Sequence, residues 1–252
     1  MQTFRRSIFF LAAFVVGAGV LLAFLHQMGL FEVRAIPVEL VGSSEGSRLR
    51  AEQLAGAGLK TRAQAAMKKF AGKRVWEIDL VQVRAALAKD EWIRDVLISR
   101  SFPNEIRVRV KPKLPVAVLV SKKGDFLPVT DESEVLGALP ATLLPDVPLM
   151  RGETFERDKD RRESAVRFLL ALNDKGVLSR RNVSEIGWSL EDGYTLTLIN
   201  PKVEVKLGED RIDLKALRAS QVLSYLEVNK LNGRIVDASF SKKVLVRLRK
   251  GP

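Results

Sequence analysis

Few side chains in this 252-residue chain could carry out chemistry. The chain has no cysteine and one histidine, His26. This composition removes thiol nucleophiles and excludes zinc sites built on His or Cys, and it disfavours a Ser–His–Asp arrangement. The sequence also has no Gly-rich loop of the kind that binds phosphate. We therefore expect no cofactor and no metal site.

Carboxylates are the remaining candidates for catalysis. Asp90-Glu91 and Asp131-Glu132 are adjacent acidic pairs. Two carboxylates suffice for glycoside hydrolysis, so an envelope hydrolase is one alternative. Nothing in the spacing singles out a catalytic pair, and these residues fit turns or surface positions. The residue types therefore favour a protein that binds partners over an enzyme.

An apolar segment near the N-terminus predicts the compartment. Ile8 to Leu25 carries no charge, and Arg5 and Arg6 precede it. As a helix this run would be about 27 Å long, close to the ~30 Å hydrocarbon core of a bilayer. Cations before the run favour a cytoplasmic N-terminus. We predict a cytoplasmic tail over residues 1–6 and a transmembrane helix over 7–27; the alternatives are a cleaved signal peptide and a buried helix.

The net charge of +12 is concentrated after this segment. Residues 31–120 carry 17 basic and 10 acidic side chains. Next to a membrane anchor, such a segment suggests contact with anionic lipid headgroups or an anionic polymer. The predicted compartment argues against nucleic acid as a partner. A solvated basic surface is the simpler alternative.

The residues after the anchor predict the order strand, helix, helix, strand, strand. Ala35–Val41 is a short strand in which Pro37 favours an edge position or the first part of a strand, because proline has no amide donor. Ala51–Ala57 is a short helix candidate. Residues 60–75 fit either a helix or a loop.

The second half of this unit has clearer signals. Asp79 and Gln82 resemble a capping box that begins a helix. Ile93–Phe102 is a strand candidate, and Glu105–Lys111 alternates strictly between apolar and basic residues, which is typical of a half-buried strand. Its apolar positions are Ile106, Val108 and Val110.

Residues 113–252 predict helices packed on one face of a sheet. Arg161–Asn173 is an amphipathic helix expected to bury Val166, Leu169 and Leu170. Strands over Val183–Leu190 and Tyr194–Ile199 flank Asp192-Gly193, a common hairpin turn. Asp210 can cap a further helix. The buried face of this helix would consist of Ile212, Ala216, Ala219, Leu223 and Leu226.

A final hairpin over Ile235–Phe240 and Val244–Arg249 offers a binding surface. No segment follows the last strand to cover it, so we expect a sheet edge whose free N–H and C=O groups a partner strand can complete. One parity would present Phe240, Val244, Val246 and Leu248. The charged side chains are Lys242, Lys243, Arg247 and Arg249, which would favour an acidic partner strand or would simply prevent aggregation.

A resemblance to a known family rests on the run EWIRDVLISRSFPNEIRVRVKPKLPVAVL, residues 91–119. It resembles the signature of the bacterial division protein family FtsQ, named DivIB in Gram-positive bacteria. The matching positions are Trp92, Ile93, Phe102, Pro103, Ile106, Val108, Val110, Pro115 and Val116. The resemblance implies an α+β chain: a POTRA domain (β-α-α-β-β) over 31–112, then a mixed α/β "β-domain" with an antiparallel C-terminal sheet over 113–252.

The resemblance also implies a function. The chain would be a single-pass type II protein of the inner membrane, with its C-terminal bulk in the periplasm at the division septum. FtsB and FtsL homologues would dock by β-strand addition, and other divisome membrane proteins are further candidate partners; the scaffold would help control septal peptidoglycan synthesis. The implied docking residues are Phe240, Lys242, Val244, Val246, Arg247 and Leu248.

Two departures from the family pattern alter this surface. Phe240 lacks a hydroxyl and Leu248 lacks a ring, where the family has aromatic residues. A POTRA-bearing secretion or outer-membrane assembly adaptor is the alternative function. The short strand around Pro37 is a second candidate docking surface.

Overall fold

The computed structural model describes residues 14–20, 30–34, 36–41 and 58–249. Residues 14–20 are helical. Within the described residues, no helix combines the length and the apolar character needed to cross a membrane. Most of the predicted span over 7–27 and all of the predicted helix Ala51–Ala57 lie outside the described residues.

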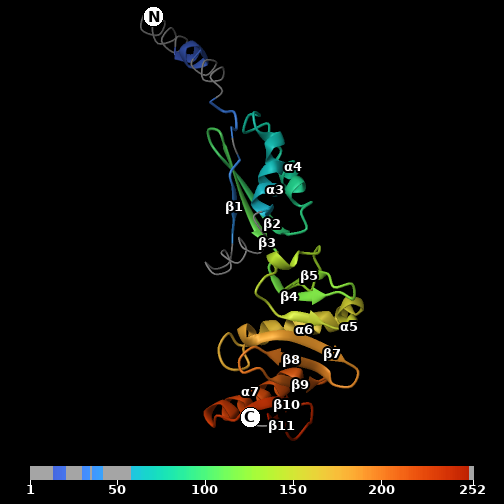
Figure 1. Ribbon diagram of the computed structural model, residues 1–252. Coiled ribbons are helices and arrows are strands. Elements are labelled where there is room, and N and C mark those ends of the chain that lie inside the picture. Colours follow the sequence, from blue (N-terminus) through green and yellow to red (C-terminus); the bar gives the residue numbers. More distant parts are fainter. Residues whose placement is uncertain (1–13, 21–29, 35, 42–57, 250–252) are drawn as a thin grey trace, which may run out of the picture. The chain divides into compact units, whose positions relative to one another are not determined.

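The chain forms two compact units, unit 1 ending at Pro112 and unit 2 beginning at Lys113. Unit 1 has a three-stranded sheet in the order β1–β3–β2, with β1 parallel and β2 antiparallel to β3 (Figure 1). Its elements are β1 (Val38–Leu40), α3 (Gly58–Met67), the 3-10 turn η1 (Lys68–Phe70), α4 (Leu80–Leu87), β2 (Ile93–Ser101) and β3 (Glu105–Pro112).

The alternation predicted for β3 is confirmed. Ile106, Val108 and Val110 are fully buried, while the residues between them are exposed. Strand β1 lies at the edge of the sheet, as predicted from Pro37, which immediately precedes it. The undecided stretch is helical through Met67, because Leu59, Ala63 and Met67 share one face and bury it in the core.

Helix α4 begins at the predicted cap. The Asp79 carboxylate accepts a hydrogen bond from the Val81 N–H at 2.9 Å, which satisfies one free donor of the first turn. At the other end of α4, the Asp90 carboxylate accepts from Arg62 Nε at 2.6 Å and so links this turn to α3. Asp90 is therefore a structural residue.

Unit 2 is built on an eight-stranded sheet in the order β11–β10–β9–β8–β7–β6–β4–β5 (Figure 1). Its strands are β4 (Pro115–Val120), β5 (Phe126–Thr130), β6 (Leu149–Arg151), β7 (Val183–Ser189), β8 (Gly193–Leu198), β9 (Glu204–Gly208), β10 (Gly233–Asp237) and β11 (Leu245–Leu248). Its helical segments are η2 (Ala141–Leu143), α5 (Glu153–Arg157), α6 (Lys159–Ala171), η3 (Arg180–Asn182) and α7 (Ile212–Val228).

The sheet of unit 2 is mixed, so the expected antiparallel sheet is wrong in part. The β4–β6, β6–β7 and β9–β10 pairs are parallel, and the other pairs are antiparallel. Helices α5 and α6 lie between β6 and β7 in the chain, and α7 lies between β9 and β10. A crossover of this length returns the chain to the same end of the sheet, so the next strand runs parallel. The mixed α+β class is confirmed.

One face of the sheet and helices α6 and α7 share a hydrophobic core. Register places one row of apolar side chains across neighbouring strands: Val236, Val205, Leu196, Ile186, Met150 and Leu119. Each of these side chains is at most 1% exposed. Helix α6 buries Val166 and Leu169 as predicted, but Leu170 is 41% exposed. The helix turns Phe168 into the core instead, which moves Leu170 out of the buried face.

The predicted role of Asp210 is also wrong. Helix α7 begins after Arg211, which has left-handed backbone angles (φ 47°), and no side chain caps the helix at this position. Asp210 instead accepts a hydrogen bond from the Nζ atom of Lys215, whose side chain is buried. A buried ammonium group needs a nearby carboxylate, and Asp210 meets that need.

Candidate partner-binding edge

Strand β11 is an outer strand of the unit 2 sheet. It pairs antiparallel with β10, with Val246 opposite Val236 and Leu245 opposite Asp237. No strand of the described part of the chain pairs with its other side. All four β11 residues are exposed. The predicted edge is therefore present in the fold.

Hydrogen bonding indicates which backbone groups of β11 are open. The Arg249 N–H donates to the Asn232 carbonyl at 2.8 Å, toward the β10 side. Successive N–H groups of a strand point to opposite sides. The N–H groups of Val246 and Leu248 therefore point away from β10, where a further strand would lie.

The opposite edge of the sheet, at β5, is covered by the chain itself. The segment after β5 folds back, and the Leu139 N–H donates to the Phe126 carbonyl at 2.9 Å. Leu136 and Thr130 make equivalent bonds, to Pro128 and Glu134, at 2.8 and 2.9 Å. Of the two outer strands, only β11 lacks such cover among the described residues.

The side chains of β11 divide between the two faces of the sheet. Val246 continues the buried apolar row beyond Val236 and is 37% exposed. Val244 packs partly against the same core. Leu245 and Arg247 have the opposite parity, and Leu245 is 45% exposed. An incoming strand would therefore find apolar side chains on both faces.

Phe240 and Val244 do not lie on a strand, which corrects the expected strand bounds Ile235–Phe240 and Val244–Arg249, while Lys242 lies in the loop between β10 and β11 as those bounds placed it. Strand β10 ends at Asp237, whose carboxylate accepts from the Ser239 N–H at 3.0 Å and the Ser239 hydroxyl at 2.6 Å. This side-chain turn diverts the chain into a loop. The loop is held by Arg218, which donates to the Ser241 carbonyl at 2.6 Å. Phe240 and Lys242 are both exposed beside the edge.

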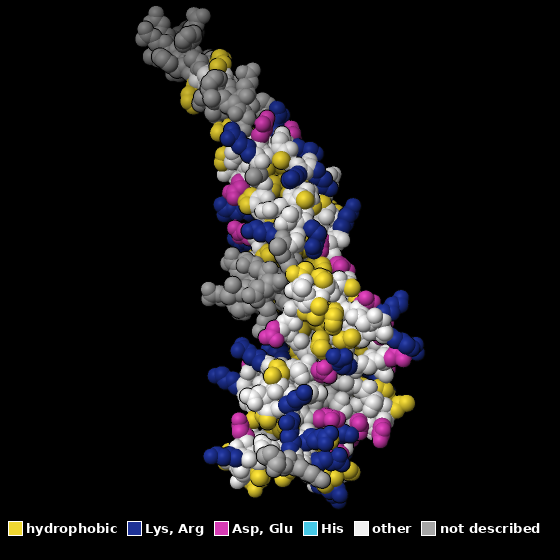
Figure 2. Space-filling model, viewed as in Figure 1, with side chains coloured by type: hydrophobic (Ala, Val, Ile, Leu, Met, Phe, Trp, Pro, Cys, Tyr) yellow, Lys and Arg dark blue, Asp and Glu magenta, His cyan; other side chains and the backbone are white. Residues whose placement is uncertain are grey.

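Arginines surround the open end of β11. A hollow of about 520 Å³ is lined by Leu248 and three arginines, Arg234, Arg247 and Arg249. Arg249 donates to the Lys202 carbonyl at 2.6 Å. Arg234 and Arg247 form no ion pair with a described residue, so their charge is available to a partner. Figure 2 shows Lys and Arg side chains gathered over the end of unit 2 that carries β10 and β11.

Sequence reasoning missed two residues of this surface, Leu245 and Arg234. Leu245 was not assigned to the expected docking parity, although it is exposed on β11. Arg234 belongs to β10 and reaches the edge because the β10–β11 register shifts between Gly233 and Ile235. A bulge of this kind has no clear sequence signal. The alternation around Leu245, in contrast, could have predicted exposed side chains on both faces of the last strand.

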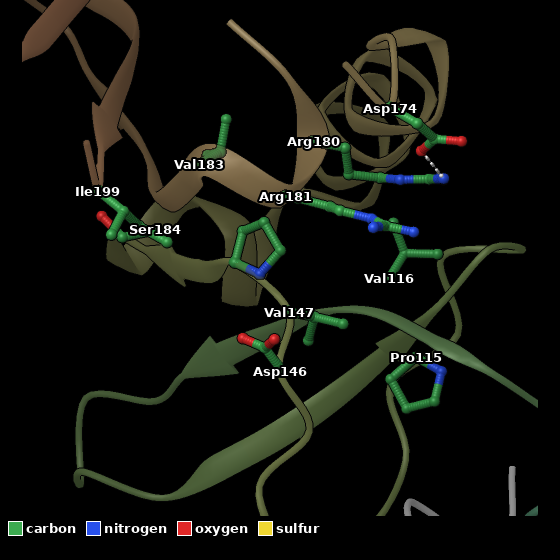
Figure 3. A pocket seen from close by; sticks show the side chains of 11 residues that line it. Pro115, Val116, Asp146, Val147, Asp174, Arg180, Arg181, Val183, Ser184 and Ile199 are labelled. Atoms are coloured by element: carbon green, nitrogen blue, oxygen red, sulfur yellow. Dashed lines mark hydrogen bonds and ion pairs between the residues drawn. The ribbon is translucent and has the colours of Figure 1, made fainter. Parts of the chain in front are cut away.

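A second cavity, of about 510 Å³, lies in unit 2 (Figure 3). Its lining is mixed: Pro115 and Val147 are apolar, Asp146 and Arg181 are charged, and the Arg180 guanidinium donates to Asp174 at 2.7 Å. The Ser184 hydroxyl donates to the Thr197 carbonyl at 3.0 Å and so is already engaged. Among the residues that line this cavity, no nucleophile is hydrogen-bonded to a base, so the lining suits the binding of a ligand better than catalysis. Among the described residues, no cluster of three or more His, Cys, Asp or Glu could hold a metal.

Comparison with known families gives two matches. The family described as "POTRA domain, FtsQ-type" matches residues 62–111. The family described as "Cell division protein FtsQ/DivIB, C-terminal" matches residues 117–239. The second match ends before β11 and does not include that edge.

Individual relatives agree with these matches. Cell division protein FtsQ of Geobacter sp. (strain M21) is 28% identical over 183 residues, covering 70% of this chain and 66% of the relative. FtsQ of Syntrophotalea carbinolica is 25% identical over 188 residues, covering 71% and 66%. DivIB of Solibacillus silvestris is 26% identical over 165 residues, covering 65% and 56%. The chain thus spans just under two thirds of the first two relatives.

Proposed function

The chain belongs to the FtsQ/DivIB family of cell division proteins, and we propose that it acts as a binding scaffold of the division machinery. In this proposal residues 1–6 lie in the cytoplasm and 7–27 anchor the chain in the inner membrane. A POTRA domain over 31–112 and a β-domain over 113–252 then lie on the periplasmic side at the septum. The chain positions partners and breaks no bond itself.

The open side of β11 is the observation that carries this proposal. A strand from an FtsB or FtsL homologue adds beside β11 and completes the free groups of Val246 and Leu248. Side chains supply specificity: Val246 extends the core row, Val244 packs against the same core just before β11, and Phe240 lies in the loop beside the strand. Strand addition buries exposed apolar surface at the same time, which favours binding by ~25 cal/mol per Å².

Charge selects the partner. Arg247 lies within β11 and Lys242 lies in the loop before it. Arg234 and Arg249 line the same hollow as Arg247. An incoming strand with Asp or Glu in the facing positions forms complementary pairs, and a basic strand is repelled. Binding to this edge would place the FtsB–FtsL pair beside the septal synthesis machinery and so help control peptidoglycan synthesis.

The double variant Val246→Pro with Arg247→Glu tests the proposal. Proline at position 246 removes an outward donor and leaves the bonds toward β10 in place, and glutamate repels an acidic partner. We expect the full-length variant in nanodiscs to lose at least tenfold in affinity for the purified FtsB–FtsL homologue pair, which corresponds to about 1.4 kcal/mol.

The matched control is Arg167→Glu, which reverses an exposed arginine on α6. It should bind as the wild type does. Hydrogen exchange of β8 and β9 verifies that each variant remains folded. Unchanged affinity of the folded double variant would exclude β11 as the docking site.

A further inference from the structure

One end of unit 1 exposes apolar and basic side chains together. This end consists of residues 30–34, 68–81 and 101–104, and we call it the entry end because the chain enters the unit there at Leu30. Figure 1 shows the β2–β3 turn at the same end of the unit as the turn that precedes α4. The entry end has no role in the partner-binding edge described above.

Backbone hydrogen bonds join the three segments into one surface. The Val75 N–H donates to the Phe31 carbonyl at 3.0 Å, and the Val33 N–H donates to the Lys73 carbonyl at 2.9 Å. Arg100, next to the β2–β3 turn, donates to the Val75 and Ile78 carbonyls at 3.1 and 2.8 Å. The entry end therefore presents a fixed arrangement of side chains.

Large apolar side chains of the entry end are left exposed although unit 1 has its own core. Phe102 at the β2–β3 turn is 67% exposed, and Val81 in the first turn of α4 is 74% exposed. Trp76 is 46% exposed, and its ring lies 5.1 Å from that of Phe31. Aromatic and aliphatic side chains presented together in this way are typical of proteins that lie against a membrane interface.

The charges of the entry end are predominantly basic. Residues 30–34 and 68–79 contain five basic and three acidic side chains. Two of the acids are engaged: Glu77 pairs with Arg74 at 3.2 Å, and Asp79 caps α4. The Nζ atoms of Lys69 and Lys73 lie 5.0 and 6.0 Å from the centroid of the Phe70 ring and have no carboxylate partner among the described residues. Figure 2 shows basic and hydrophobic side chains adjoining at this end of unit 1.

The covalent chain limits how far the entry end can lie from a bilayer. Leu25 ends the uncharged run, and Leu30 is five residues later. Five residues extend at most ~18 Å. If the run is inserted as proposed above, the exposed rings and the lysines lie within reach of the outer leaflet.

We propose that the entry end docks on the outer leaflet of the bilayer that holds the anchor, with anionic phospholipid headgroups bound by Lys69 and Lys73. Phe102, Trp76 and Val81 insert at the level of the headgroups. This inference rests on the proposed anchor. Docking would fix the orientation of unit 1 on the membrane by a second contact besides the anchor.

The absence of cysteine from the chain allows single labels. The full-length variants Phe102→Cys, Val81→Cys and Lys89→Cys are each labelled with bimane and reconstituted into nanodiscs of phosphatidylcholine with about 30% phosphatidylglycerol, with doxyl-labelled lipid as the quencher. Lys89 is exposed beyond the opposite end of α4 and serves as the control. We expect roughly twofold stronger quenching at 102 and 81 than at 89.

Charge is tested by Lys69→Glu with Lys73→Glu, matched by Lys60→Glu with Lys89→Glu in the same unit. The first pair should reduce quenching at position 102 by about half, and the second should leave it unchanged. Nanodiscs of phosphatidylcholine alone should give the same reduction as the first pair.

The outcomes separate this inference from the proposed function. A chain that does not assemble into nanodiscs contradicts the anchor itself. A chain that assembles but shows equal quenching at 102 and 89 overturns the docking proposal and leaves the anchor and β11 untouched. Quenching at 102 that persists without phosphatidylglycerol overturns the headgroup contact.

Discussion

Val246 lies directly opposite Val236 across the β10–β11 ladder, yet Val236 is fully buried and Val246 is 37% exposed. The difference arises because Val236 has a strand on each side, whereas β11 has a neighbour on one side only among the described residues. The row of core side chains is therefore interrupted at Val246. A bound strand would place its own side chain at the next position of this row.

Truncation of each valine should give different costs. Val236→Ala removes two methyl groups from a packed core and should lower the free energy of unfolding of unit 2 by roughly 2–3 kcal/mol. Val246→Ala should cost less than about 1 kcal/mol in the free chain. Hydrogen exchange of α7 and β9 in urea, measured on the detergent-solubilised full chain, gives both values. Equal costs would mean that β11 is covered in solution.

Gly193 and Gly208 are opposed in the β8–β9 ladder, and both have positive φ, 63° and 75°. A Cβ at Gly193 would lie 2.3 Å from the Gly208 carbonyl carbon. We expect Gly193→Ala to destabilise unit 2 by about 3 kcal/mol or more. Gly124→Ala is the control, because its φ is 87° with open space around it, and should cost about 1–2 kcal/mol. Similar melting temperatures for the two variants would contradict the close approach.

The Asp210–Lys215 pair should make stability depend on pH. A hydrogen bond from Lys215 and, to a smaller extent, one from Arg211 lower the pKa of the Asp210 carboxyl below its ordinary value of 3.8. A lowered pKa in the folded state contributes stability that is present above the unfolded value and is lost as pH falls through the folded value. Asp210→Asn should therefore destabilise unit 2 at neutral pH, and the difference from the wild type should shrink below about pH 4.

Lys215→Met provides the control for this pair. It removes the buried ammonium group, so adding Asp210→Asn to it should have little further effect on the urea midpoint. Additive effects of the two substitutions would show that the pair does not interact. A gap between Asp210→Asn and the wild type that does not begin to shrink as the pH falls below about 4 would also contradict the assignment.

Sequence periodicity predicted which face of a strand or helix is buried, but it did not predict which strands pair with one another in the sheet. The alternation through Ile106, Val108 and Val110 identified the buried side of β3, and the hairpin pairing of the last two strands was also readable. The parallel β6–β7 and β9–β10 pairs depend on how helices return the chain across the sheet, which no local pattern encodes. Leu170 shows a smaller error of the same kind. A small rotation of helix α6 about its axis buries Phe168 at the border of the apolar face and exposes Leu170.

The candidate edge was predicted in position and less well in detail. Exposure of Val246 and Leu248 followed from the place of the last strand. Phe240 was assigned to the end of a strand, but hydrogen bonds between Asp237 and Ser239 end β10 three residues before Phe240. Side-chain turns of this kind compete with the ladder, and residue type alone does not decide the outcome.

Amide exchange should distinguish the two edges of the unit 2 sheet. In the free chain, the Val246 and Leu248 amides should exchange roughly tenfold or more faster than the Arg247 and Arg249 amides, because only the second pair points toward β10. The Thr130 amide on β5 is the matched control: it donates to Glu134 at 2.9 Å and should be slow. Addition of the FtsB–FtsL homologue pair should slow Val246 and Leu248 and leave Thr130 unchanged. Slow exchange at Val246 before any partner is added would mean that this edge is already occupied, and strand addition at β11 would then be excluded.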